Sequence, residues 1–288
     1  MKIGLVGGKD IKKYTIADKL WTIIAKVTEL NFDFEVISIA DENMIKRFYK
    51  QFTNDKDFFG FNVALPWKES FANLVDKNNY VSSKCKAINT VYKINNKVLT
   101  FNTDVIGVSG ALSLYEKNIN STLIMGLGGA GFATAEYLAL NQIALKVYGY
   151  DPNIPLGLKH NFIRLKNLNN VLNHKYNLII NATPRGKYYF DQSPQSFESP
   201  LSAKMLKTIT HPSSIIQEMN YFPAVTPLLE TANLLGLRTI SGIQMLVRQA
   251  LHSLLLYRGV SCSEDQVNLI IKELDLIGDK LEKDLFII

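Results

Sequence analysis

The chain has 288 residues, 47% hydrophobic and 20% charged, with a formal net charge of +6. That length and apolar content suit one large or two smaller globular domains. No apolar run approaches the roughly 20 residues of a membrane span, no basic block interleaved with aromatics predicts nucleic-acid binding, and Cys85, Cys262 and the four histidines match no disulfide or metal pattern. We therefore expect a soluble cytoplasmic protein without a nucleic-acid, membrane or metal partner.

The first part of the chain alternates between strand and helix patterns. In chain order we expect a strand over 2–6, a helix over 15–30, a strand over 32–39, a helix over 41–52, a strand over 60–63, a hairpin of 86–92 with 97–101, and a helix over 105–114. Pro66 should begin a turn or a helix, because proline suits a first helical turn. This order predicts an α/β domain of about 110 residues.

A glycine-rich turn follows between a strand and a helix. Gly126, Gly128 and Gly131 form the pattern G-x-G-x-x-G after the apolar run 121–125 and before helically spaced apolar residues over 132–140. The first glycine permits the bend, the second admits a pyrophosphate, and the third lets helix pack on strand. Free amides and the helix dipole there favour negative charge. The expected dinucleotide contacts are Gly126, Gly128, Gly129, Ala130 and Gly131.

An acidic residue ends the next expected strand. Asp151 directly follows residues 145–150. An acid about 20 residues after the glycine turn usually binds ribose hydroxyls and repels a 2′-phosphate, which favours NAD over NADP. The segment Asp151-Pro152-Asn153 also suits a simple turn, so both roles stay open.

The remaining elements complete a two-domain α/β interpretation. They are strands over 176–181, over 215–220 and near Thr239, a buried helix over 245–257, and a last helix opened by the capping box 263–266. We expect an N-terminal α/β substrate-binding and catalytic domain over 1–108 and a Rossmann-like dinucleotide-binding domain over 109–242. Helices within 243–288 should return to the first domain, with a cleft between the domains.

Three polar segments precede the glycine turn and carry candidate chemistry. They lie at 60–68, 87–91 and 101–107. Lys68 follows a strand-to-helix turn and Asp104 comes from a neighbouring turn, so the two side chains could pair. Such a pair could pass a proton to or from a substrate hydroxyl while hydride moves at its carbon. The alternative is a surface Lys68 and a helix-capping Asp104.

Together these segments resemble the shikimate dehydrogenase family, including its quinate/shikimate relatives. The family carries G-x-N-V-T-x-P-x-K, A-x-N-T-V, N-T-D-x-x-G, a glycine fingerprint, N-A-T-x-x-G, Y-x-P-x-x-T and G-x-x-M-L-x-x-Q. The corresponding segments here, in the same order over nearly the whole chain, are 60–68, 87–91, 102–107, 126–131, 181–186, 221–226 and 242–249.

The resemblance implies an activity and a set of site residues. It implies an NAD(P)H-dependent oxidoreductase that reversibly reduces 3-dehydroshikimate to shikimate, in chorismate and aromatic amino acid biosynthesis. Lys68 would donate the proton or fix the hydroxyl, with Asp104 as its partner and as a contact to the ring hydroxyls. The other implied substrate contacts are Asn62, Asn89, Tyr221 and Gln249, and the implied nicotinamide contacts are Thr183 and Gly242.

The substrate pocket departs from the family's pattern at two places. Lys13 and Thr15 stand where the family has an S-x-S pair that binds the substrate carboxylate. Lys13 could bind that carboxylate as a point charge or could point to water. Ala64 replaces a threonine, which removes one hydroxyl contact. These changes motivate a hypothesis from another class, a paralogue that binds a ligand without fast turnover.

The cofactor site also departs from the pattern. Asp151 stands near the place where NADP-using members carry the arginine of an N-R-T segment. This favours NAD, although Lys159 or Arg164 could reach a phosphate. With Thr15, it motivates an alternative enzyme that prefers NAD and acts on quinate or another cyclic hydroxy acid. We expect a small hydroxy acid as substrate, and a monomer or a homodimer.

Overall fold

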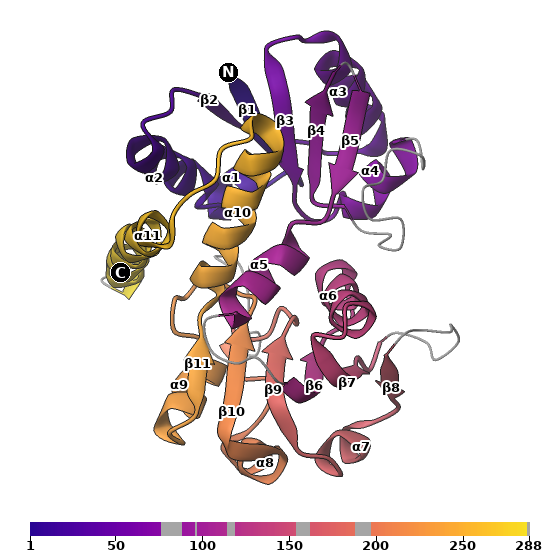
Figure 1. Cartoon of the computed structure of the whole chain (residues 1–288), viewed down its shortest axis with the longest axis vertical. Coiled ribbons are helices and arrows are strands. Elements are labelled where there is room, and N and C mark those ends of the chain that lie inside the picture. Colours follow the sequence, from indigo (N-terminus) through magenta and orange to yellow (C-terminus); the bar gives the residue numbers. More distant parts are fainter. Residues whose placement is uncertain (76–87, 96, 114–118, 154–161, 188–196, 287–288) are drawn as a thin grey trace. The chain divides into compact units, whose positions relative to one another are not determined.

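The computed structural model describes residues 1–75, 88–95, 97–113, 119–153, 162–187 and 197–286. The chain divides into two compact units (Figure 1). Unit 1 contains Met1–Ile106 and Gln249–Leu274, and unit 2 contains Gly107–Arg248 and Asp275–Ile288. The predicted α/β fold class is confirmed, while the predicted domain bounds at 108 and 242 stay predictions.

Unit 1 is built on a mixed five-stranded sheet. Its elements are β1 (Lys2–Gly7), α1 (Ile11–Tyr14), α2 (Ala17–Thr28), β2 (Asp33–Ser38), α3 (Glu42–Asn54), β3 (Phe58–Val63), α4 (Lys68–Leu74), β4 (Thr90–Ile94) and β5 (Lys97–Phe101), with parts of α5 (Asp104–Leu112), α10 (Gly242–Arg258) and α11 (Glu264–Phe286). The strand order is β2-β1-β3-β4-β5. The first three strands are parallel, and β4 runs antiparallel to both neighbours.

An aromatic core holds β3 in place. Phe61 of β3 packs edge-on against Phe52 of α3 and Phe71 of α4, with ring centroids 4.8 Å and 5.2 Å apart. Edge-to-face pairs of this kind add roughly 0.5–1.5 kcal/mol each beyond the area they bury. All three rings are at most 1% exposed. This packing fixes the end of β3, which carries Asn62.

Unit 2 is a doubly wound α/β unit. Its elements are β6 (Ile119–Met125), α6 (Gly129–Leu140), β7 (Ala144–Tyr150), β8 (Ile163–Leu165), α7 (Leu168–Leu172), β9 (Tyr176–Asn181), α8 (Ala203–Ile209), β10 (Thr210–Glu218), α9 (Pro227–Leu234) and β11 (Arg238–Ile240), with the rest of α5, α10 and α11. All strands pair in parallel, in the order β11-β10-β9-β6-β7-β8. The order reverses between β9 and β6, and ligands of such sheets bind at the carboxyl ends of these strands.

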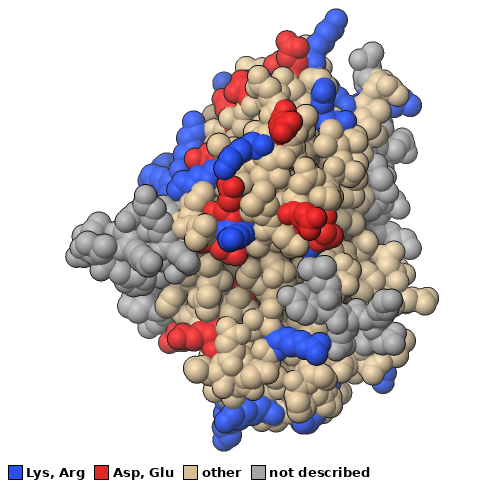
Figure 2. All heavy atoms as spheres, turned by 60° about the vertical axis from the view of Figure 1, so that its left-hand side comes forward, with Lys and Arg blue, Asp and Glu red and all other residues tan. Residues whose placement is uncertain are grey.

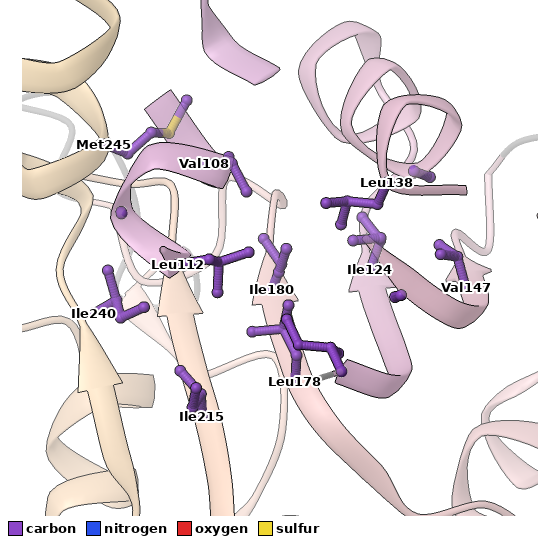
Figure 3. Packing of buried hydrophobic residues seen from close by; sticks show 14 of the residues in the cluster. Val108, Leu112, Ile124, Leu138, Val147, Leu178, Ile180, Ile215, Ile240 and Met245 are labelled. Atoms are coloured by element: carbon purple, nitrogen blue, oxygen red, sulfur yellow. The ribbon is translucent and has the colours of Figure 1, made fainter. Parts of the chain in front are cut away.

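Both faces of the unit 2 sheet are buried. Ile124 lies in one apolar cluster with residues of α5 and α6, such as Leu138, and Figure 3 shows this packing. Its neighbours Leu123 and Met125 lie in a second cluster with residues of α7, α8 and α9. Burial on both faces explains why this strand is a continuous apolar run rather than an alternating one.

Most predicted elements are present, and the differences are local. The capping box is confirmed, since the Ser263 amide donates to Gln266 Oε1 at 3.0 Å and the Gln266 amide to Ser263 Oγ at 3.3 Å. Pro66 lies in a turn, and α4 begins only at Lys68. The strand predicted over 215–220 is β10, which runs from Thr210 to Glu218. Residues 210–214 were missed because the sequence Thr-His-Pro-Ser-Ser has no apolar pattern. The sequence analysis missed α1, β8, α7, α8 and α9.

The surface mixes charges of both signs. On the face shown in Figure 2, lysine and arginine side chains lie interspersed with acidic and uncharged ones. In the described part of the chain, no helix combines the length and apolarity of a membrane span. Within the same residues, no three His, Cys, Asp or Glu side chains gather as a metal site would require.

Candidate active site

Lys68 and Asp104 form an ion pair in unit 1. Each is the first residue of a helix, α4 and α5. Lys68 Nζ lies 2.5 Å from Asp104 Oδ2, and the side chains are 14% and 6% exposed. The Asp104 amide donates to Asn102 Oδ1 at 3.0 Å, which satisfies one free amide at the start of α5. The predicted pair is therefore formed away from the surface, and its catalytic role stays a prediction.

Asn89 orients this pair. Its Nδ2 donates to Asp104 Oδ1 at 2.7 Å and to Gln249 Oε1 at 2.9 Å. Its Oδ1 accepts from the Thr103 amide at 2.6 Å and from the hydroxyls of Thr90 and Thr103 at 3.0 and 3.1 Å. Because a backbone N–H can only donate, it fixes which end of the Asn89 amide is oxygen. Both hydrogens of Asn89 Nδ2 thus face acceptors of the site.

Three buried hydroxyls lie behind Asn89, and we call Thr90, Thr103 and Ser253 the hydroxyl cluster. Their oxygens lie 3.0–3.3 Å apart, and all three residues are 0% exposed. Asn62 Nδ2 donates to Ser253 Oγ at 2.9 Å and to Thr90 Oγ1 at 3.0 Å. The cluster therefore joins β3, β4 and α10. Sequence reasoning missed Ser253, although it lies one helical turn after Gln249 and so on the same helix face.

Lys13 lies in α1, and Thr15 follows α1 in the connection to α2. Lys13 Nζ is 2.8 Å from Asp10 Oδ1 in a pair whose lysine side chain is 71% exposed. The hydrogen bond from Lys13 lowers the pKa of the Asp10 carboxyl below its ordinary value. Thr15 Oγ1 accepts from the Ala17 amide at 3.1 Å, at the start of α2. These contacts are structural, and the roles of Lys13 and Thr15 toward a substrate stay predictions.

The glycine turn of unit 2 needs glycine for two different reasons. Gly126 has a φ of +88°, and a Cβ on Gly131 would lie 2.1 Å from the Gly126 carbonyl oxygen. Packing within the protein therefore requires both residues to be glycine. A Cβ on Gly128 would meet no atom within 4 Å. Gly129 and Ala130 form the first turn of α6, whose amides have no partner within the helix.

Asp151 contacts the glycine turn directly. Its Oδ2 accepts from the Leu127 amide at 2.9 Å, and its Oδ1 accepts from the Asn153 amide at 2.8 Å. The Asp151 carboxylate thus closes the turn at 151–153 and also holds the glycine turn. The simple turn that the sequence allowed at 151–153 is therefore present. Of the two basic residues considered for a phosphate, Lys159 lies outside the described residues and Arg164 is half-buried on β8.

A second polar network lies at the ends of β9 and β10. Asn181 Oδ1 accepts from the amide and the hydroxyl of Thr183, at 3.0 and 2.7 Å. Asn181 Nδ2 donates to both carboxyl oxygens of Glu218, at 3.0 and 2.9 Å. Burial raises the pKa of Glu218 to about 7, although the hydrogen bonds that it accepts act in the opposite direction. Sequence reasoning missed Glu218, whose only signal is an acid closing an apolar run.

Tyr221 follows this network closely in the chain, and Gly242 packs near it in space. A Cβ on Gly242 would lie 2.0 Å from the Asn220 carbonyl oxygen, so the start of α10 packs directly on the chain that leaves β10. Lys187 Nζ lies 5.8 Å from the centre of the Tyr221 ring. Such a distance suits a cation–π contact.

The structure gathers the predicted residues separately within each unit. The polar network of unit 1 contains Asn62, Lys68, Asn89, Asp104 and Gln249. In unit 2 the glycine turn contacts Asp151, and the backbone of Thr183 lies 2.8 Å from the Cβ position of Gly126. Ala87, the first residue of the A-x-N-T-V segment, lies outside the described residues.

Comparisons with known proteins identify relatives of this chain. Residues 6–91 match the family model described as the shikimate dehydrogenase substrate binding domain. A shikimate dehydrogenase (NADP(+)) of Pelodictyon phaeoclathratiforme is 30% identical over 276 residues, 90% of this chain and 92% of that protein.

Solved structures support the same assignment. A chorismate mutase/shikimate 5-dehydrogenase fusion protein from Clostridium acetobutylicum matches with a TM-score of 0.81 and 25% identity, covering 97% of this chain and 98% of that one. Shikimate dehydrogenase 1 from Peptoclostridium difficile shares the fold, with a TM-score of 0.78 and 24% identity over 96% and 98% of the two chains. The chain therefore belongs to the shikimate dehydrogenase family of NAD(P)-dependent oxidoreductases.

Proposed function

We propose that this protein catalyses the reversible NAD(P)H-dependent reduction of 3-dehydroshikimate to shikimate, a step in the biosynthesis of chorismate and the aromatic amino acids. The observation that carries the proposal is the buried pair of Lys68 and Asp104, held by Asn89 and Gln249. The 30% identical relative, whose name specifies this activity, supports the choice of substrate.

Lys68 is proposed to move the proton. Reduction of the ring ketone adds a hydride to its carbon and a proton to its oxygen. When bound, the reduced dinucleotide supplies the hydride. The Lys68 ammonium donates a proton to the oxygen, and Asp104 Oδ2 holds that ammonium in place. In the reverse direction the Lys68 amine accepts the hydroxyl proton.

The unit 1 network offers matched groups to a hydroxylated ring. Asn62 Nδ2 is engaged by the hydroxyl cluster, which leaves Asn62 Oδ1 to accept from a ring hydroxyl. Gln249 Oε1 accepts from Asn89, which leaves Gln249 Nε2 to donate. An analogue lacking a hydroxyl would leave such a group unpaired, at a cost of about 1–3 kcal/mol. Lys13, Thr15 and Tyr221 are proposed for the carboxylate side.

The residues of unit 2 fit a dinucleotide. Gly128 has open space where a Cβ would stand, so packing among the described residues does not require glycine there. Close approach of a pyrophosphate would require it. The amides of Gly129 and Ala130, in the first turn of α6, would bind that pyrophosphate. Thr183 and Gly242 are proposed to line the nicotinamide side.

Asp151 supports a preference for NAD over NADP. Its carboxylate is held by the amides of Leu127 and Asn153, at the place where the adenosine ribose of such folds binds. A 2′-phosphate would meet a fixed negative charge there. The relative from Pelodictyon phaeoclathratiforme is named for NADP(+). We propose that this chain differs from it, and a direct comparison of the two nucleotides decides the point.

A rate matrix tests the proposal. Purified protein is assayed with NADH and NADPH against 3-dehydroshikimate and 3-dehydroquinate. We expect 3-dehydroshikimate to react fastest, and NADH to be the better donor. Faster reaction of 3-dehydroquinate would favour a quinate enzyme. Nucleotide binding without turnover of either substrate would favour a ligand-binding paralogue.

A pair of variants tests the role of Lys68. Lys68→Ala should lower kcat by roughly 10²–10⁴, the usual contribution of a positioned proton donor. Lys26→Ala is a matched control, because Lys26 also pairs with an acid in unit 1, Glu273, but is 71% exposed. It should leave kcat unchanged. Equal kcat in Lys68→Ala and wild type would remove Lys68 from the mechanism.

A further inference from the structure

The end of β10 carries a carboxyl group that the proposed reaction does not use. Glu218 is 0% exposed. Its oxygens accept from the Asn181 amide group at 3.0 and 2.9 Å, from the backbone amides of Met219 and Asn220 at 2.9 Å each, and from the Thr226 hydroxyl at 2.9 Å. All these partners donate, which suits a carboxylate acceptor.

The Glu218 carboxyl holds the segment 181–185 from two sides. Asn181, which donates to Glu218, accepts from Thr183 and also donates to the Arg185 carbonyl at 3.2 Å. Asn220, whose amide donates to Glu218, uses its side chain to bond the carbonyls of Thr183 and Arg185 at 3.0 and 3.1 Å. Thr183 is therefore tied to Glu218 through both asparagines.

The same carboxyl holds the segment 219–226. Thr226, which donates to Glu218, also accepts from the Leu229 amide at 3.4 Å as the N-cap of α9. Between the two contacts to Glu218, at Asn220 and at Thr226, lies Tyr221. Gly242 packs on the Asn220 carbonyl, as described above. One buried side chain thus fixes the segment that carries Thr183 and also the segment on which Gly242 packs.

We infer that Glu218 is a positioning residue for the nicotinamide half of the dinucleotide, acting through Asn181 and Asn220 on Thr183 and Gly242. The inference rests on the proposed function, which assigns Thr183 and Gly242 to that half. The adenosine and pyrophosphate half is assigned to the glycine turn and Asp151. Loss of the carboxylate should therefore affect the two halves of the ligand unequally.

The test compares an intact dinucleotide with a ligand that lacks nicotinamide. Glu218→Gln keeps the side-chain shape but places an NH₂ group against donors. Calorimetry at pH 8 gives Kd for NAD⁺ and ADP-ribose, or for NADP⁺ and 2′-phospho-ADP-ribose if wild type prefers NADP⁺. We expect Kd of the dinucleotide to rise about ten-fold, the effect of losing one hydrogen bond to a charged group. Kd of the nicotinamide-free ligand should stay within about two-fold.

Matched variants separate positioning from loss of folding. Thr226→Val removes one donor to Glu218 and should shift dinucleotide binding less, in the same direction. Thr210→Val is the control, because this buried threonine of unit 2 donates only to the Leu206 carbonyl, at 2.7 Å, among its described contacts. It should change neither Kd. Circular dichroism verifies folding, and Glu218→Asp, which keeps the charge, replaces Glu218→Gln if that variant does not fold.

The outcomes are distinct. Equal weakening of both ligands, or no weakening of the dinucleotide, would overturn the positioning role. If wild type binds neither dinucleotide, both the inference and the proposed function fail. If wild type binds a dinucleotide but does not reduce 3-dehydroshikimate, only the substrate assignment fails, and the Glu218→Gln comparison still decides the inference.

Discussion

Replacing either Lys68 or Asp104 alone should destabilise unit 1. Replacing both should lower the free energy of unfolding by less than the sum of the two single losses. Removing one partner of a buried ion pair costs about 3–5 kcal/mol, because the other charge stays buried alone. Lys68 retains 14% exposure, so we take the lower end, about 3 kcal/mol, for Lys68→Met and for Asp104→Asn. In the double variant no unpaired charge remains, and a coupling of about 2 kcal/mol gives a total loss near 4 kcal/mol.

The chain offers a selective probe for this cycle. Its two tryptophans, Trp21 and Trp67, both lie in unit 1. Trp67 directly precedes Lys68, and its indole N–H donates to the Ile39 carbonyl at 3.2 Å. Tryptophan fluorescence in urea therefore reports the unfolding of unit 1. Losses that simply add would show that the two charges do not stabilise each other. Turnover near the wild-type rate in the double variant would refute the catalytic assignment.

Three other predictions concern the remaining parts of the site. Gly128→Ala should keep the Tm and weaken dinucleotide binding. Gly131→Ala should lower the Tm, because its Cβ would lie 2.1 Å from the Gly126 carbonyl oxygen. Thermal denaturation and calorimetric titration distinguish the two variants, and equal losses of Tm would contradict the prediction. Ser253→Ala removes an acceptor from Asn62. In steady-state kinetics it should lower kcat/KM for 3-dehydroshikimate about ten-fold and leave the dinucleotide KM unchanged. An unchanged kcat/KM would count against a role of the hydroxyl cluster in substrate binding. Burial disfavours the Glu218 carboxylate more than its hydrogen bonds favour it, and so raises the pKa from 4.5 to about 7. The stability that the folded protein gains by binding this proton is therefore fully present below pH 4.5 and is lost as pH rises through 7. Urea unfolding followed by circular dichroism should show the free energy of unfolding falling by roughly 2–3 kcal/mol between pH 5 and 8, and Glu218→Gln should abolish that fall.

Features governed by local backbone physics were predictable from the sequence. Gly126 and Gly131 follow from the needs of a strand-to-helix turn, and the structure shows a positive φ at one and a close backbone contact at the other. The Ser263 capping box is equally local. The Lys68–Asp104 pair is not local, since 36 residues separate its members. The sequence offered it as one of two alternatives, because each residue follows an expected strand.

Long-range pairing of buried polar groups was not predictable in the same way. Ser253 meets Asn62 across 191 residues, and Glu218 meets Asn181 across 37. No local pattern predicts which two buried polar side chains hydrogen-bond to each other, because their pairing depends on the register of separate strands and helices. The start of α9 was different, since Thr226 before Pro227 is a recognisable helix start that the sequence analysis overlooked.

The two hydrogen bonds that Asp151 accepts limit which substitutions, natural or engineered, can change the nucleotide preference. If Asp151 has its proposed role, replacing it by a small or basic residue should admit a 2′-phosphate. The same change would leave the amides of Leu127 and Asn153 without the Asp151 carboxylate as acceptor. The first amide belongs to the glycine turn, which is proposed to bind the pyrophosphate. A single substitution at Asp151 should therefore change the nucleotide preference but weaken nucleotide binding. We expect variants that accept NADP efficiently to need a second, compensating change near residue 127 or 153, acquired before or together with the loss of the acid.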